Sequence, residues 1–121
     1  MRIVVNNIIP FGSFVAMSVG HWIYVKDIEK VTPTLITHES IHWGQQKELL
    51  IVGFYLLYVI FFLAELVRCT FDKSRGTHAD GRHRSLWKRA YRSIAFEREA
   101  YTHDGDGQYI KNRKKYAWAW A

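Results

Sequence analysis

The pattern H-E-x-x-H occurs once in the chain, at residues 38 to 42, and it carries the residue types of a metal-dependent hydrolase. On a helix, residues four apart share a face, so His38 and His42 can bind one metal ion together. Glu39 lies one step further round the helix, where its carboxylate can hold a metal-bound water instead of the metal. The pattern therefore predicts two ligands for Zn²⁺ and one general base. The alternative is a pair of buried, hydrogen-bonded histidines on a core helix.

The residues around the motif favour a helix over 33–47. Thr32 suits the N-cap, and Pro33 suits the first helical position, where its missing N–H leaves no hydrogen bond unmade. Leu35 and Leu49 fall near the stripe that holds the two motif histidines, which predicts that the histidines face inward.

A zinc site of this kind needs a third protein ligand, and Glu97 is the best candidate. A helix is expected over 85–103, with Ile94 and Tyr101 on its apolar face. Glu97 lies three residues after Ile94 and four before Tyr101, so it falls within the apolar arc, whereas Glu99 is expected to face solvent. A carboxylate that faces a core is costly unless it meets a metal or a cation.

Two alternatives stay open at this position. Glu97 can instead form a salt bridge with Arg98 or a neighbouring arginine. Glu65 is the alternative third ligand, because it lies 23 residues after His42 inside an apolar segment. If Glu65 is not a ligand, we expect a helix-end carboxylate close to Arg68 and solvent.

Other polar residues are weaker candidates for the site. Tyr101 and His103 are possible auxiliary donors in catalysis, and each is also explained by a structural role. A loop is expected over 70–84, because it has two glycines and dense charge. Three side chains in this loop can bind metals in principle: His78, Asp80 and His83. Their spacing fits no standard metal site, which favours a solvated loop.

The segment 96–101, F-E-R-E-A-Y, resembles the F-E-x-x-A-D segment of prenyl-protein endopeptidase and heat-shock-type membrane gluzincins. The chain is also similar to small predicted zinc metallopeptidases of the HExxH gluzincin type, which share H-E-x-I-H-x-x-Q, F-Y-L-x-Y and F-E-R-E-A-Y. The resemblance implies that Glu97 is the third zinc ligand and Glu39 the catalytic base. Tyr101 stands where the membrane gluzincins have Asp, so the resemblance supplies no carboxylate there to orient a ligand histidine.

An apolar helix is expected over 48–69. The stretch 49–67 carries one charged residue and is followed by Arg68, which is close to the length of about 20 residues that spans a bilayer. Tyr55 and Tyr58 lie in its middle, whereas interfacial aromatic belts lie at the ends of a span. Membrane association through this stretch and burial in a protein core therefore both stay open.

Residues 3–24 carry no Asp, Glu, Lys or Arg, which raises the question of a targeting segment. Asn, Pro, Gly and Ser residues interrupt the stretch, so no convincing signal peptide is present, and a cytoplasmic or a membrane-associated location both remain open. We expect short strands instead, over 2–5, 14–19 and 21–26, within an N-terminal part that ends at residue 32.

The length of 121 residues suits a single domain, and the net charge of +6 favours an acidic partner such as anionic lipid, nucleic acid or an acidic substrate. The chain has no nucleic-acid-binding motif, which argues against nucleic acid as the partner. Cys69 is the only cysteine, so a cysteine-based zinc site is excluded. The basic, aromatic tail over 104–121 is expected to pack over the core, or else to form an interfacial anchor.

These patterns together predict a mainly helical α+β domain over 1–121 with a minimal zincin-like fold. It has a small N-terminal β-sheet, the HExxH helix, an apolar helix and a third-ligand helix. The expected function is that of a zinc metalloendopeptidase acting on a peptide or protein substrate. The alternative is a catalytically silent, membrane-associated binding or regulatory protein with a structural zinc site. The sequence leaves the oligomeric state open.

Overall fold

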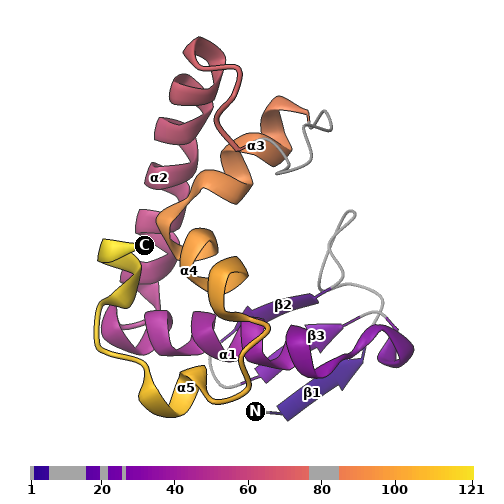
Figure 1. The fold of residues 1–121 in the computed structure, drawn as a ribbon. Helices are drawn as coiled ribbons and strands as arrows, with labels where there is room; N and C mark the ends of the chain where they lie inside the picture. The colour runs from indigo at the N-terminus through magenta and orange to yellow at the C-terminus, as the bar shows by residue number, and fades with distance from the viewer. Residues whose placement is uncertain (1, 6–15, 20–21, 26, 77–84) are drawn as a thin grey trace.

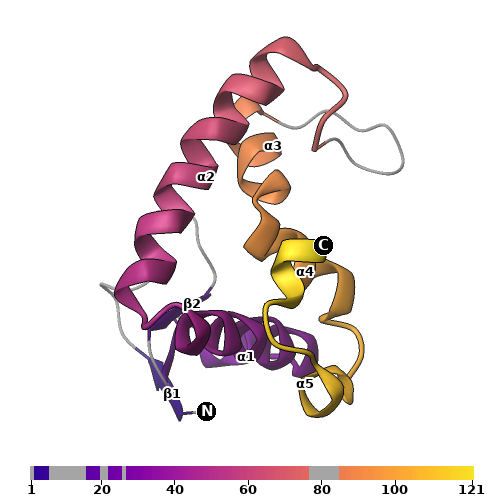
Figure 2. The same ribbon diagram turned by 90° about the vertical axis from the view of Figure 1, so that its left-hand side faces the viewer.

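A computed structural model of the chain describes residues 2–5, 16–19, 22–25, 27–76 and 85–121. The described residues form a mainly helical α+β fold with one small sheet, as predicted (Figure 1). Two long helices dominate it: one lies beside the sheet, and the second rises away from the end of the first (Figure 2). Of the loop expected over 70–84, the last eight residues lie outside the described part of the chain, and His78, Asp80 and His83 are among them.

The sheet has three strands in the order β1-β3-β2, and all three lie within the predicted ranges. β1 (Arg2–Val5) pairs in parallel with β3 (Trp22–Val25), and β2 (Ala16–Val19) pairs with β3 in antiparallel fashion. Ile23 and Val25 are fully buried, as expected for residues two apart on one face of a strand. Because β2 contacts the motif helix, the sheet supports that helix from one side.

The motif helix α1 spans Pro33–Glu48, one residue longer than predicted, and follows a short 3₁₀ turn, η1 (Ile28–Lys30). Its start is the predicted one. The Thr32 hydroxyl accepts a hydrogen bond from the Leu35 N–H at 3.1 Å, and proline occupies the first turn.

The link from α1 to α2 (Val52–Phe71) contains two residues with positive φ that are not glycine. Leu50 has φ 58°, and Ile51 has φ 62° and ψ −61°. The Val52 N–H donates to the Leu50 carbonyl at 2.6 Å, so Ile51 is the centre of a classic γ-turn. Both conformations are unfavourable for residues with a Cβ, and together they turn the chain sharply between the two helices.

The single helix expected over 85–103 is a wrong prediction, because the chain forms two helices there. α3 spans Leu86–Ser93 and α4 spans Ala95–His103, and Ile94 between them is extended, with φ −57° and ψ 135°. The Ile94 side chain is fully buried in the core with Phe54 and Phe96. The break lets α3 follow α2 while α4 turns towards α1, so a packing requirement overrides the local helical preference.

The tail packs over the core through its aromatic residues, as expected. It contains a short helix α5 (Tyr109–Asn112) and a 3₁₀ turn η2 (Ala117–Trp120). The Trp118 ring lies edge-on to Phe96, with ring centroids 4.9 Å apart, and its centroid is 6.2 Å from that of Phe61. The tail therefore covers α4 on the side away from α3 (Figure 1).

We predict that Leu50→Gly stabilises the protein by about 0.5–1 kcal/mol. Glycine removes the left-handed strain, and the leucine side chain is 84% exposed, so little packing is lost. Thermal and urea unfolding followed by circular dichroism measure the change. Leu50→Ala is the matched control, because it shortens the side chain but keeps Cβ. Equal stability of the two variants would contradict the strain at this position.

Candidate metal centre

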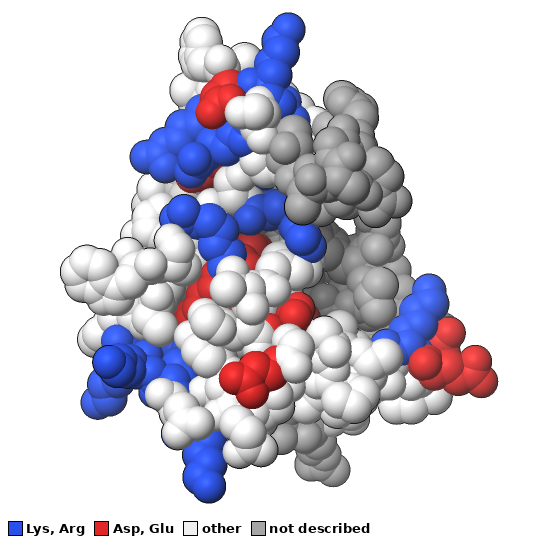
Figure 3. Space-filling model, in the orientation of Figure 1, with Lys and Arg blue, Asp and Glu red and all other residues white. Residues whose placement is uncertain are grey.

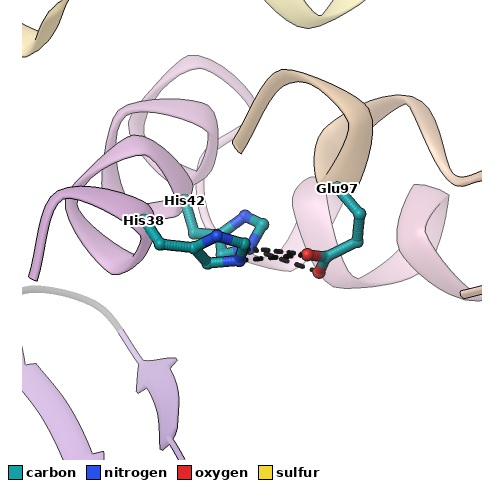
Figure 4. A group of neighbouring side chains, drawn as sticks. All are labelled: His38, His42 and Glu97. Carbon is teal, nitrogen blue, oxygen red and sulfur yellow. Dashed lines mark hydrogen bonds and ion pairs between the residues drawn. The ribbon is translucent and has the colours of Figure 1, made fainter. Parts of the chain in front are cut away.

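The three residues predicted as metal ligands meet between two helices. His38 and His42 extend from neighbouring turns of α1, and Glu97 reaches them from the first turn of α4 (Figure 4). The two Nε2 atoms lie 3.2 Å apart, and the Glu97 Oε1 atom lies 3.2 Å from each. All three possible ligand atoms fall within 4.8 Å of one another. Such a convergence brings the donor atoms to one point, where a single ion can bridge them.

The chemistry of the group fits a divalent metal ion. Two imidazole nitrogens and one carboxylate oxygen form the donor set of many catalytic zinc sites, and three protein ligands leave a further position free. His38, His42 and Glu97 are all buried. Among the described residues, these three form the only group of His, Cys, Asp and Glu side chains that is arranged to hold a metal ion.

The electrostatics show how strongly the group depends on a positive charge. Burial alone would raise the pKa of Glu97, but the charge on His42 and hydrogen bonds from both histidines hold it well below its usual range. Burial alone would lower the pKa of His42, yet the Glu97 carboxylate raises it to about 9. Without a metal the group is a buried ion pair, and a bound metal would replace the histidine proton as the compensating charge.

The other ring nitrogen of each histidine has its own partner. His38 Nδ1 lies 3.1 Å from Asp104 Oδ2, and His42 Nδ1 lies 2.8 Å from Gln45 Oε1. Both partner atoms are acceptors, so the Nδ1 atoms carry the protons, and in the neutral rings the Nε2 lone pairs are left for a metal. These contacts fix the ring orientations in the manner of partners to metal-binding histidines.

Asp104 is a site residue that the sequence analysis missed, because it was assigned to the tail. It is the residue directly after α4 and keeps a helical backbone conformation, and it lies seven residues after Glu97, a spacing of two helical turns that continues the same face. This spacing is the signal that would have identified it. Asp104 thus provides a carboxylate that contacts a candidate ligand histidine, while the Tyr101 ring lies edge-on to His38, with ring centroids 4.5 Å apart.

The two auxiliary candidates lie in different surroundings. Tyr101 borders the metal group through His38, and the Arg92 guanidinium lies over its ring, 3.5 Å from the centroid. His103 stacks in parallel on Tyr109 instead, with ring centroids 3.9 Å apart. Of the two, only Tyr101 directly contacts a residue of the metal group among the described contacts.

Tyr58 is a second residue that the sequence analysis did not assign to the site. Its hydroxyl donates to Glu97 Oε2 at 2.6 Å, from the inner face of α2. Burial and the Glu97 charge hold the pKa of the Tyr58 phenol well above its usual value, so it remains a donor at neutral pH. The signal was its place inside an apolar helix, because a buried tyrosine hydroxyl needs a partner.

Glu39 is buried beside the ligands but outside the ligand group itself. Its negative charge contributes to the raised pKa of His42. Burial and the Glu39 charge also raise the pKa of the Tyr55 phenol to about 12. Glu39 is therefore a buried carboxylate whose charge acts on both His42 and the protonated Tyr55 phenol.

Glu65, the alternative third ligand, is bound elsewhere. Arg75 forms two hydrogen bonds with its carboxylate, at 2.6 and 2.9 Å, and Arg68 adds a third at 2.9 Å. Despite burial, which acts in the opposite direction, these arginines lower the pKa of Glu65. The structure brings Glu97, and not Glu65, to the histidines.

The expectation that Glu99 faces solvent is wrong, since this residue is 1% exposed. Its carboxylate is instead enclosed by Gln45 of α1 and by the tail, which folds back over this residue. Arg113 donates to both Glu99 oxygens, at 2.6 and 3.0 Å, and Tyr109 donates to one of them at 2.7 Å. Only the tertiary structure reveals this cover.

Glu99 connects the tail to the metal group through Gln45. The Gln45 amide donates to Glu99 Oε1 at 2.9 Å and to the Phe96 carbonyl at 3.0 Å, while its oxygen faces His42. Arg113 also donates to Glu48 of α1 at 2.9 Å. A continuous chain of hydrogen bonds therefore runs from Arg113 through Glu99 and Gln45 to His42.

No family model, curated protein or solved structure matches the chain. The interpretation of the site therefore depends on its own geometry and chemistry. That geometry consists of three buried donors at one point, an acceptor behind each histidine and an adjacent buried carboxylate. These features together support a metal centre.

We predict that the purified protein binds one metal ion per chain and that Glu97→Ala abolishes this binding. His42→Ala is expected to have the same effect, because each substitution leaves two of the three donors. Elemental analysis of identically purified variants measures the stoichiometry. Glu65→Ala is the matched control and should keep the metal. Retention of metal in Glu97→Ala would contradict the assigned ligand set.

We also predict that Arg113→Met weakens metal affinity by about 10–100-fold, the range seen when partners of metal ligands are removed. Without the guanidinium, the Glu99 carboxylate is left uncompensated and Gln45 loses its fixed orientation. Competition with a chromogenic chelator measures the affinity. Lys111→Met removes an exposed charge from α5 and is the control. Unchanged affinity in folded Arg113→Met would show that the tail only stabilises the fold.

Proposed function

We propose that this chain is a zinc-dependent peptidase with a minimal zincin-like domain. The observation that carries the proposal is the convergence of His38, His42 and Glu97 next to the buried carboxylate of Glu39. A purely structural metal site needs ligands but no additional carboxylate beside them. The arrangement supports a hydrolytic site because three protein ligands leave one coordination position free for water, and Glu39 can act on that water as a general base.

Zinc is the favoured ion on chemical grounds. Two imidazoles and one carboxylate match its preference for nitrogen and oxygen donors in a tetrahedral arrangement. Bound Zn²⁺ would polarise the scissile carbonyl and lower the pKa of a coordinated water towards 7. Asp104 and Gln45 would keep the two imidazoles in the tautomer that this ion requires.

In the proposed reaction Glu39 moves one proton. Its carboxylate takes a proton from water as the water oxygen attacks the carbonyl carbon of the peptide bond. The carbon–nitrogen bond then breaks, and Glu39 delivers the same proton to the departing amine nitrogen. Tyr101 lies beside His38, and in the proposed reaction its hydroxyl donates to the negative charge that develops on the substrate.

The sheet supports an extended peptide as the substrate. β2 lies at one edge of the described sheet and contacts α1, which carries the motif. An edge strand can add a further strand through main-chain hydrogen bonds, which fixes a peptide without reading much of its sequence. This mode would hold the peptide close to the helix that carries His38, Glu39 and His42.

The second candidate is a catalytically silent, membrane-associated binding or regulatory protein that keeps the metal for stability. The burial of all three ligands favours it, since structural metal sites are closed. The two candidates differ in what they require of Glu39: hydrolysis needs its carboxylate, whereas a structural site does not.

The test compares wild type with Glu39→Gln, each loaded with one zinc, on a library of fluorescence-quenched peptides. We expect Glu39→Gln to keep its metal and its fold and to lose at least 100-fold in hydrolysis rate, the usual order for a general base. Glu29→Gln, an exposed change of the same kind, is the control and should keep full activity. If zinc-loaded wild type cleaves no faster than Glu39→Gln, the peptidase proposal is wrong and the catalytically silent binding protein is the better assignment.

A further inference from the structure

The outer face of α2 is apolar along its whole length, although nothing in the described structure covers it. Seven large apolar residues of the helix are each at least half exposed: Val52, Leu56, Val59, Ile60, Leu63, Val67 and Phe71. They recur at spacings of three, four and seven residues, so they form one stripe. The buried residues of the helix, Phe54, Glu65 and Cys69, lie on the opposite side.

A helix at the surface of a water-soluble protein normally has its polar residues on the outward face. Here the arrangement is reversed, since the outward face is the more uniformly apolar one. Among the described helices, α2 alone is long and apolar enough to cross a membrane by length and composition, and only 17% of its apolar window is buried. It is therefore not the enclosed core helix that an apolar sequence alone would suggest, and its exposed stripe needs a partner.

The charges beside this stripe indicate which partner fits. Arg68 has a side chain that is 62% exposed, and Lys73 and Lys88 are exposed close to the same end of α2. Figure 3 shows basic side chains gathered at the upper end of the molecule, over the C-terminal end of α2. The chain as a whole carries a net charge of +6. An apolar stripe with cations at its end matches an anionic lipid surface, whereas two copies of the chain would bring like charges together.

An exposed tryptophan widens the apolar surface. Trp87 of α3 stacks on Phe62 of α2, with ring centroids 5.8 Å apart, and is 63% exposed. A partly exposed indole beside an aliphatic stripe suits the boundary between lipid headgroups and acyl chains, because its ring is apolar and its N–H is polar.

The inner face of α2 argues against a helix that crosses the bilayer. A 20-residue helix is about 30 Å long, which equals the hydrocarbon thickness. However, α3 is packed along the same helix and carries Lys88 and Arg92, and the Glu65–Arg75 ion pair lies on the inner side. A crossing would carry these charges into the hydrocarbon. A helix that lies parallel to the surface immerses only its outer face.

We propose that the protein binds anionic membranes through the outer face of α2, with the helix lying in the plane of the interface. The inference is independent of the proposed peptidase activity, because it concerns a different surface and its readout is membrane partition.

The first test is co-sedimentation of the full, metal-loaded chain with vesicles of phosphatidylcholine containing 30 mol% phosphatidylglycerol, and with vesicles of phosphatidylcholine alone. We expect the protein to bind the anionic vesicles, and we expect its partition to the neutral vesicles to be at least fivefold lower. The double variant Leu56→Glu, Leu63→Glu should lose at least tenfold in partition. Ile28→Glu is the matched control, since Ile28 is as exposed as Leu63 but lies before α1, and it should keep its binding.

A second measurement does not depend on the folding of the double variant. Single nitroxide labels on cysteines at Leu56, Leu63 and Val67 report immersion depth by their accessibility to oxygen and to a water-soluble nickel chelate. Cys69 is fully buried and does not compete for the label. A helix lying in the interface gives similar, shallow depths at all three positions.

Three outcomes would overturn the proposal. One is the absence of binding to anionic vesicles by folded, metal-loaded wild type. Another is a depth profile that peaks at Leu63 and falls towards both ends, which identifies a spanning helix. The third is a stable dimer in solution that Leu63→Glu dissociates, which assigns the stripe to a second copy of the chain. Each result can be obtained with Glu39→Gln, so it is separate from any outcome of the hydrolysis test.

Discussion

The buried carboxylate of Glu97 is the constraint on which the rest of the structure depends. A negative charge enclosed in a small core is costly unless cations or hydrogen-bond donors meet it. His38 and His42 meet it from α1, and Tyr58 meets it from α2. One side chain of α4 thus joins α4 to α1 and to α2. The same geometry that compensates the charge also places two imidazole nitrogens where a metal ion can bind.

Successive layers of contacts extend outward from this centre. Asp104 and Gln45 hold the outer nitrogens of the two histidines, and Glu99 and Arg113 hold Gln45 in turn. The tail is therefore part of the support of the metal group and not only a cover. Since a metal ligand must be held to within a fraction of an ångström to bind well, such support is expected to add to the affinity that the ligands provide.

The two faces of helix α2 lie in different environments. Its inner face supplies Tyr58 to the metal group and Phe54 to the core, while its outer face is apolar and exposed. The γ-turn at Ile51 sets the direction in which the helix leaves α1. The backbone strain at this turn is consistent with a geometry imposed by the packing of α2 on α3 and α4, since local preference would not choose it.

The sequence by itself determined the elements whose signals are local. The Thr32 cap, the motif helix, the three short strands and the two motif histidines follow from turn chemistry and from periodicity, and Glu97 follows from its place in an apolar arc. Tertiary structure alone decided the rest. The break at Ile94 depends on a core already formed, and the burial of Glu99 depends on Arg113, which lies outside the helix of Glu99. No helical period contains that information, because periodicity gives the angle of a side chain but not what covers it.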